Sequence, residues 1–204
     1  MSNISSPYKR VKTTNSGINP SKKLHTGTTI SFIPDETIFG DLAKLDVESI
    51  KKKCELKTYL NAGLKIVLTV DKEKFTYYHK KGLLDYIQSK MTNPLYNMDT
   101  IFIDDKDEDE NSYQIAMVFN NDTEEYIDSF VNSLPLSEGG TQETGFKKAL
   151  TQVFTDYINK NGLLTNKDKG LQIKGEDIRR GLVCVINMKH DNPLYDSGIM
   201  SGCQ

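Results

Sequence analysis

The sequence predicts an α+β domain, in which groups of strands pack against helices. Hydrophobic residues make up 37% and charged residues 26% of the 204 residues, which is typical of a folded protein rather than a disordered one. Short β-branched runs occur in groups separated by turn residues, which is typical of hairpins. Longer segments repeat apolar residues at helical spacing, above all at 143–161. Runs of strands that alternate with separate helices in this way are typical of the α+β class.

The first elements expected along the chain are a strand, a helix and a hairpin. Residues 29–33 alternate and are β-branched, so they predict a strand. Asp46 can cap a helix that runs to about Asn61, where a glycine two residues later gives a stop signal. Two strand-like runs with a charged turn between them then predict a hairpin over 64–70 and 75–79.

A short helix and a group of three strands are expected next. The helix covers 82–91, and the strands cover 100–103, 113–119 and 125–131. We expect the three strands to form an antiparallel meander. The strongly acidic run 104–110 lies between the first two strands, so it predicts an exposed hairpin loop.

The last part of the chain predicts a long helix, a short helix and a buried strand. The long helix covers about 143–161, and Thr141 is expected to cap it. Its apolar stripe consists of Phe146, Leu150, Val153, Phe154, Tyr157 and Ile158. The short helix is expected at 176–181. Residues 182–188 (LVCVINM) are almost wholly apolar, so they predict a strand buried on both faces.

Charge is distributed unevenly along the chain, although the formal net charge is only −2. Residues 1–25 carry +5 and no acidic residue, residues 104–128 carry −9, and residues 137–190 carry +3. The near-neutral sum excludes a wholly basic nucleic-acid-coating protein, but it leaves room for a local basic face. The sequence shows neither a membrane-spanning apolar run nor a signal peptide, so we expect a soluble, cytoplasmic protein without a membrane partner.

The three cysteines give no sign of a disulfide framework, a zinc site or Cys–His catalysis. Cys54, Cys184 and Cys203 are far apart, no CxxC pair occurs, and the three histidines are scattered. Cys54 and Cys184 fall at apolar positions of periodic segments. We therefore expect them to be buried, reduced thiols in a reducing compartment.

Three candidate binding sites each have a simpler structural alternative. The acidic run 104–110 has the carboxylates for Ca²⁺ or Mg²⁺ but not the spacing of an EF-hand, so a solvated loop is favoured. Residues 138–141 (EGGT) have the glycines to cradle an anion at a helix start, but a capped turn is favoured. Basic residues on and after the long helix have the charge to face a phosphate backbone, although most exposed lysines only solubilise. They are Lys147, Lys148, Lys160, Lys167, Lys169, Lys174, Arg179 and Arg180.

Five segments form an ordered set of motifs. They are 27–35 (GTTISFIPD), 60–66 (LNAGLKI), 82–87 (GLLDYI), 138–151 (EGGTQETGFKKALT) and 175–190 (GEDIRRGLVCVINMKH). Together they resemble the B subunits of type IIA DNA topoisomerases, the family of DNA gyrase and topoisomerase IV. The fourth segment is the most specific, since it resembles the family signature EGGTHE.GF..AL.R. The resemblance covers about residues 26–196 and does not distinguish gyrase from topoisomerase IV.

The resemblance implies the transducer domain, whose α+β fold is similar to domain 2 of ribosomal protein S5. On this basis residues 1–25 are a flexible basic arm, and 26–40 are the end of the ATPase-type domain. Residues 41–196 are the transducer, and 197–204 are an irregular tail. In the family the transducer couples ATP binding and hydrolysis to DNA strand passage. The family's partners are DNA, the topoisomerase A subunit and a second B subunit.

The resemblance also implies what this chain lacks. Of the family's ATP pocket, only Gly27 and Thr28 are expected to remain as cofactor-binding residues. The family lysine that reaches the γ-phosphate is missing, because 198–200 (GIM) stand in its place, and the signature histidine is Gln142. We therefore expect no catalytic residues, no metal ligands, no ATPase activity of this chain alone and poor binding of the family's ATP and Mg²⁺. The candidates to face DNA, through weak backbone contacts, are Lys147, Lys148, Arg179 and Arg180.

Two other classes of protein remain open. One is a stand-alone, non-catalytic binding or structural protein that keeps the S5-like fold. The other is a different ATPase-family member with that fold, such as a mismatch-repair or chaperone relative, which the EGGT motif disfavours. The oligomeric state is also left open by the sequence.

Overall fold

The chain divides into two compact units, Met1–Val47 and Glu48–Gln204. The computed structural model describes residues 33, 35–40, 45–95, 98–137, 139–164, 170 and 173–193. The strand expected at 29–33 lies outside the described residues, apart from Ile33. All five strands of the larger sheet and the helices that cover it belong to the second unit.

The elements follow the sequence-based prediction closely within the described residues. In chain order they are α1 (Glu36–Phe39), α2 (Val47–Leu60), β1 (Lys65–Val70), β2 (Glu73–Tyr78), α3 (Leu83–Lys90), β3 (Ile101–Lys106), β4 (Ser112–Phe119), β5 (Tyr126–Val131), β6 (Leu134–Pro135), α4 (Thr141–Lys160), α5 (Gly175–Ile178) and β7 (Leu182–Lys189). The short elements α1 and β6 are not predicted. The mixed sheet with helices packed against it confirms the α+β class.

The strands form one two-stranded sheet, β1-β2, and one five-stranded sheet of order β3-β4-β7-β5-β6. The predicted antiparallel meander of β3, β4 and β5 is wrong, because β7 lies between β4 and β5. It pairs antiparallel with β4 and parallel with β5. The long helix α4 makes this possible, since a crossover helix returns the chain in parallel beside β5. As the most apolar strand, β7 takes the middle of the sheet, where both its faces are buried.

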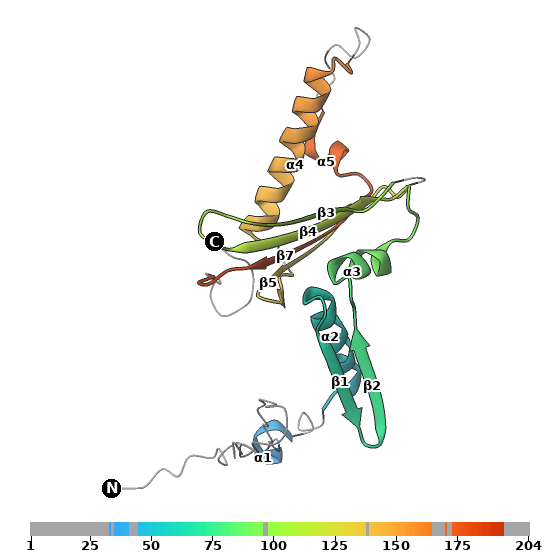
Figure 1. Ribbon diagram of the computed structural model, residues 1–204, viewed down its shortest axis with the longest axis vertical. Coiled ribbons are helices and arrows are strands. Elements are labelled where there is room, and N and C mark those ends of the chain that lie inside the picture. The colour runs from blue at the N-terminus through green and yellow to red at the C-terminus, as the bar shows by residue number, and fades with distance from the viewer. Residues whose placement is uncertain are drawn as a thin grey trace, which may run out of the picture. The chain divides into compact units, whose positions relative to one another are not determined.

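Both faces of the five-stranded sheet carry a core, as the ribbon shows with α4 and α3 on opposite sides (Figure 1). On one face Leu60, Leu83 and Ile87 of α2 and α3 pack against side chains such as Val118 and Val185. On the other face α4 and α5 pack against the alternate residues of the same strands. This second core consists of Met117, Leu150, Ile178, Leu182, Cys184 and Ile186.

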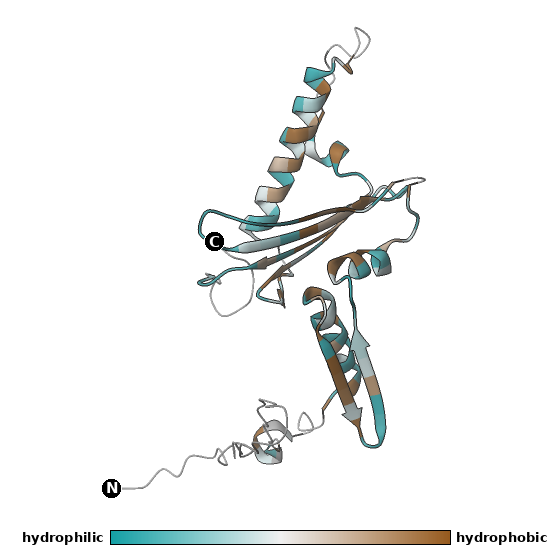
Figure 2. Ribbon diagram, in the orientation of Figure 1, coloured by the Kyte–Doolittle hydropathy of each residue, from teal (hydrophilic) through white to brown (hydrophobic). Residues whose placement is uncertain are grey.

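The β1–β2 hairpin packs one face against α2. Lys51 of α2 lies over the ring of Phe75 with its Nζ 4.1 Å from the ring centre. At the other end, the rings of Tyr59 and His79 stack with their centres 3.6 Å apart. Burial alternates along both strands, so every second side chain faces away from α2. Hydrophilic residues gather at the tip of the hairpin (Figure 2).

Only the first part of the apolar stripe on α4 is in the core. Leu150 is 8% exposed, whereas Val153 is 64% and Tyr157 is 61% exposed. The reason is visible in Figure 1, where α4 starts over the sheet and its second half extends past it. Helical spacing predicted an amphipathic face correctly, but the sheet is too narrow to cover its full length.

The acidic run 104–110 is exposed, as predicted, but it is not all loop. Asp104, Asp105 and Lys106 belong to strand β3, paired with β4. The loop proper is closed by Asp107, whose carboxylate accepts hydrogen bonds from the backbone N–H groups of Asp109 (3.0 Å) and Asn111 (2.9 Å). The composition of residues 104–106 did not predict a strand, because aspartate is depleted in strands.

The two described cysteines differ in burial. Cys184 is buried in β7, and desolvation raises the pKa of its thiol well above the usual value. Cys54 is only half-buried on α2, so the prediction that both thiols are buried is wrong for Cys54. Both are free thiols. The remaining cysteine, Cys203, lies outside the described residues.

Candidate functional site

The start of α4 is a tight glycine turn that its own helix covers. Gly139 has φ +74°, a conformation that favours glycine. A Cβ added there would lie 2.9 Å from the Oε2 atom of Glu143, and one added at Gly140 would lie 2.6 Å from the Oε1 atom of Gln142. A carboxylate of the protein therefore already lies against this turn. This contact favours a structural turn at residues 138–141 over an anion-binding site. The helix begins at Thr141 with Gly140 as its N-cap, so Thr141 is not the capping residue.

Gln142, the residue at the position of the family's histidine, connects α4 to the sheet. Its amide nitrogen donates to the hydroxyl oxygen of Ser129 on β5 over 2.9 Å. Its buried Oε1 atom has no hydrogen-bond partner among the described residues. The amide fixes the start of α4 against β5 in the manner of a structural contact.

One glutamate pairs with two of the four basic residues that were predicted to face DNA. Glu125, just before β5, pairs with Lys147 at 2.7 Å and with Arg179 at 2.6 Å. Burial alone would raise the pKa of Glu125, but the hydrogen bonds from these two cations outweigh it and hold the pKa below its usual value. Lys147 also pairs with Glu143 at 2.9 Å. Two cations and two carboxylates thus form a compensated network, which sequence spacing did not reveal because Glu125 is distant in sequence.

The other two DNA-facing candidates are open. Lys148 and Arg180 are exposed and form no ion pair with any described residue. The two cofactor-binding candidates, Gly27 and Thr28, lie outside the described residues. The structure therefore brings Lys147 and Arg179 together around Glu125, whereas Lys148 and Arg180 have no ion-pair partner among the described residues.

A second polar cluster joins α3 to β5 and was not predicted. Asp128 accepts hydrogen bonds from the hydroxyls of Tyr86 (2.5 Å) and Tyr126 (2.6 Å). The ammonium of Lys90 lies 3.9 Å from the same carboxylate. Burial and then the hydrogen bond to Asp128 raise the pKa of Tyr86 far above its ordinary value. The Tyr86 hydroxyl therefore stays protonated near pH 7 and joins α3 to β5 through Asp128.

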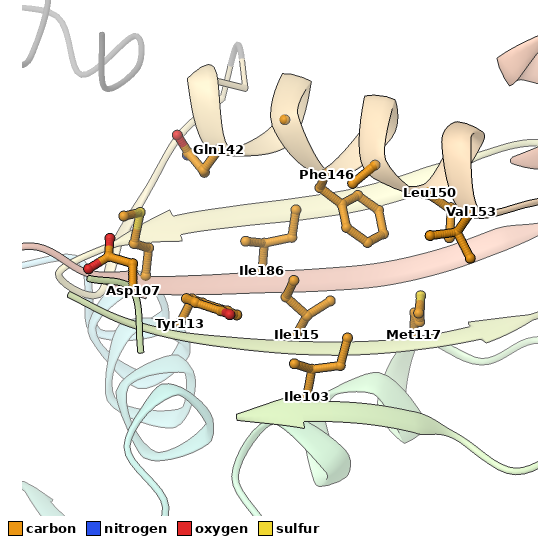
Figure 3. Close-up of a pocket in the computed structure, with 13 residues that line it drawn as sticks. Ile103, Asp107, Tyr113, Ile115, Met117, Gln142, Phe146, Leu150, Val153 and Ile186 are labelled. Atoms are coloured by element: carbon orange, nitrogen blue, oxygen red, sulfur yellow. The ribbon is translucent and has the colours of Figure 1, made fainter. Parts of the chain in front are cut away.

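An apolar groove of about 500 Å³ runs between α4 and the strands β3, β4 and β7. Its walls are aliphatic and aromatic side chains such as Ile115, Phe146 and Ile186, while Gln142 and Asp107 lie at one end (Figure 3). The lining contains no histidine, lysine or thiol that would complete a nucleophile or acid–base pair with Asp107. Most of the groove is therefore apolar, and its polar lining consists of Asp107, Tyr113 and Gln142.

The part of the chain that the structure describes also contains no group of three acidic, histidine or cysteine side chains placed to hold a metal ion. In the acidic run, Asp107 uses its carboxylate to close the loop, and the hydrogen bonds from Asn111 lower its pKa. None of the described helices is long and apolar enough to cross a membrane.

Comparison with known proteins gives one consistent family. The family model for DNA gyrase B matches residues 82–198. The DNA gyrase B subunit of Streptococcus pneumoniae (strain ATCC BAA-334 / TIGR4) is 35% identical over 175 residues, which cover 84% of this chain and 27% of that protein. The DNA gyrase B subunit of Haloferax volcanii is 34% identical over 174 residues, with the same coverage. The chain thus spans about a quarter of the length of the curated relatives it matches.

Solved structures agree with this family. The 43K ATPase domain of Thermus thermophilus gyrase B matches with a TM-score of 0.68 and 27% identity, over 81% of this chain and 45% of that one. The topoisomerase IV ATP-binding domain of Francisella tularensis matches with a TM-score of 0.69 and 25% identity, over 83% and 45%. The ATPase and transducer domains of DNA topoisomerase II from Balamuthia mandrillaris share the fold at 22% identity, with a TM-score of 0.56 over 77% and 35%.

The fold, the motif order and these matches define the chain as a protein of the topoisomerase B-subunit class. Within that class, the chain belongs to the DNA gyrase B family. The resemblance seen in the sequence is thereby confirmed.

Proposed function

We propose that this chain forms the transducer segment of a type IIA topoisomerase B subunit, which couples ATP binding and hydrolysis to DNA strand passage. The observation that carries the proposal is the match of residues 82–198 to the gyrase B family, because these residues include the whole five-stranded sheet and α4. The likeness in fold to a pair of ATPase and transducer domains also supports it. On this proposal residues 41–196 act as the transducer, between an ATPase-type end at 26–40 and a tail at 197–204.

The proposal assigns ATP chemistry to the family's ATPase domain and not to this segment. Gly27 and Thr28 are the proposed remnants of the nucleotide pocket, and the family's γ-phosphate lysine has no counterpart in 198–200. The described residues do not fit a Mg²⁺ site, since no carboxylate cluster is placed to hold one. We expect the 204-residue chain alone to show no ATP turnover above a buffer blank.

The proposed partners are DNA, a topoisomerase A subunit and a second B subunit, in the cytoplasm. Lys148 and Arg180 support a weak contact with the DNA backbone, because their charges are not compensated by described residues. Lys147 and Arg179 contribute less, because Glu125 and Glu143 already neutralise them. The alternative function is a stand-alone, non-catalytic binding protein with the same fold.

A chimera tests the transducer proposal directly. Residues 48–193 would replace the matching segment in the gyrase B protein of S. pneumoniae, the relative with 35% identity. We expect the chimera, mixed with its A subunit, to supercoil relaxed plasmid only when ATP is present. The unmodified gyrase B protein is the control for both ATP hydrolysis and supercoiling. A chimera that hydrolyses ATP at the control rate but does not supercoil DNA would contradict the transducer role and favour the stand-alone alternative.

A further inference from the structure

The β1–β2 hairpin has one face that no described element covers. The hairpin's other face, which includes Phe75 and Tyr77, is half-buried and packs against α2. The uncovered face consists of Lys65, Val67, Thr69, Lys74, Thr76 and Tyr78, and we call it the open face. Val67 is 53% and Tyr78 is 50% exposed, so the open face presents apolar as well as charged groups to solvent.

The open face is positively charged and has no acidic residue. Alternation along β2 places Glu73 on the side of α2, where its charge acts on Lys51. Five lysines lie on the hairpin and in the residues after it, against two acids, so 64–81 carries +3. The lysines, none of which forms a salt bridge with a described residue, are Lys65, Lys72, Lys74, Lys80 and Lys81. This charge is uncompensated, unlike that of Lys147 and Arg179.

The register of the hairpin sets the distance between the two lysines of the open face. Val67 pairs with Thr76 at its centre, and Lys74 pairs with Thr69. Lys65 and Lys74 therefore occupy diagonal corners, separated by four residue steps along the ribbon, which is about 13 Å. The major groove of B-DNA is about 12 Å wide and admits a two-stranded ribbon. Lys65 lies on β1 and Lys74 on β2, so a ribbon that lies along the groove directs each lysine to the phosphates on the side of its own strand.

We propose that the open face binds in the major groove of B-form DNA. Lys65 and Lys74 contact phosphates on the two sides of the groove, while Val67 and Thr76 lie between them against the base edges. Threonine and apolar side chains suit such edges, where they meet hydrogen-bonding groups and the thymine methyl. The surface selects DNA over double-stranded RNA, because the major groove of A-form RNA is too narrow and deep for side chains to read. This inference adds a DNA contact to the one proposed for Lys148 and Arg180, and it rests on the proposed function only for DNA being the relevant polyanion.

A binding measurement on the full 204-residue chain tests the inference. The probe is a fluorescein-labelled 20-base-pair DNA duplex, followed by anisotropy between 50 and 200 mM salt. The variant Lys65→Gln/Lys74→Gln is expected to weaken binding by about tenfold and to reduce the slope of log K against log salt by about 1.8, the value for two lost phosphate contacts. The variant Val67→Asp, which places a carboxylate between the two lysines, is expected to weaken binding at least as much.

The matched control is Lys52→Gln/Lys53→Gln, which removes the same charge from exposed positions of α2, the helix behind the hairpin. It is expected to change the affinity by less than about twofold, the size of a diffuse electrostatic effect at this salt. Thermal melting by circular dichroism checks that every variant is folded. A duplex RNA of the same sequence is expected to bind about tenfold more weakly, because only its backbone is accessible to the ribbon.

Several results would overturn the inference. One is an equal loss of DNA affinity in the two double variants. Another is an affinity for the RNA duplex equal to that for the DNA duplex. A third is no binding of DNA by the unmodified chain at 50 mM salt. Preferential binding of an acidic peptide such as poly-glutamate would instead identify a protein partner and overturn it as well. The binding result is independent of the supercoiling result, because duplex binding is measured on the 204-residue chain and not on the chimera. Conversely, loss of hairpin binding leaves ATP-dependent coupling in the chimera to be judged on its own.

Discussion

Asn187, in the middle of β7, donates its side-chain amide to the backbone carbonyl of Leu60, the last residue of α2, over 3.1 Å. Both residues are buried, and they are 127 positions apart in the sequence. The last carbonyls of a helix have no partner within it, so the amide satisfies one of them. Together with the packing of Leu60 against Val183 and Val185, this hydrogen bond joins α2 to the central strand of the sheet.

Replacing Asn187 by Ala should lower the free energy of unfolding by about 1–3 kcal/mol, because the Leu60 carbonyl would remain buried without a donor. Urea unfolding measures the change. Gln88→Ala, at an exposed position of α3, is the control and should leave stability unchanged within about 0.5 kcal/mol. Equal midpoints for the two variants would mean that the Asn187 amide contributes nothing to stability.

Glu125→Gln should destabilise the chain at pH 7 by about 1 kcal/mol, since Lys147 and Arg179 lose their shared carboxylate at a partly exposed site. The pKa of Glu125 is lower in the folded state than in the unfolded state. Its contribution is therefore complete above the unfolded value of about 4.3, and it is lost as the pH falls through the folded value.

The measurement is urea unfolding of both proteins at pH 7 and at several values from pH 5 down to 3. The difference in stability should shrink steadily below about pH 4.3. The control is Glu124→Gln, at the exposed residue next to Glu125. Its stability should equal that of the unmodified chain both at pH 7 and at pH 3. A difference in unfolding free energy that stays constant through this acid range would show that the charge of Glu125 does not contribute to stability.

Leu150→Ala should cost about 2–5 kcal/mol, because Leu150 is buried where α4 meets the sheet and its removal leaves a cavity. Val153→Ala, one turn later and 64% exposed, should change stability by less than about 0.5 kcal/mol. Chemical unfolding of the two variants compares them on one scale. Similar losses would contradict the finding that the second half of α4 lies beyond the sheet.

Two glycines near the start of α4 should respond in opposite directions to alanine. Gly139→Ala should destabilise by about 1–2 kcal/mol, since its φ of +74° is costly for any residue with a Cβ. Gly145→Ala lies inside the helix, where an added Cβ meets no atom within 4 Å, and should stabilise by about 1 kcal/mol. Thermal melting measures whether each substitution raises or lowers the stability of the chain. Stabilisation by Gly139→Ala would show that the turn does not require a positive φ.

The sequence predicted the kind and approximate bounds of most elements, but not how the strands are arranged. Apolar periodicity and turn residues are local signals, so they placed α2, α4 and the hairpin within a few residues. Strand order depends on pairing between distant segments, and no local signal showed that β7 inserts between β4 and β5. The boundary of β3 was missed for a related reason, because pairing with β4 overrides the low strand propensity of Asp104 and Asp105.

The candidate site shows the same limit. Sequence motifs identified the family and the four basic residues Lys147, Lys148, Arg179 and Arg180. They did not show that Glu125 neutralises Lys147 and Arg179, since the three residues meet only in the folded chain. The open face of the hairpin was missed because its two lysines are nine residues apart and become neighbours only through the register of β1 and β2.

The position of β7 has a consequence for synthesis. The ribosome must complete residue 189 before the middle of the sheet exists, although β3, β4 and β5 are finished by residue 131. Until then β4 and β5 each present an unpaired edge, and such edges are templates for joining another chain. The interval in which a nascent chain is most prone to aggregate therefore spans the translation of α4 and α5. It ends when β7, the last of these strands to be translated, pairs with β4 and β5.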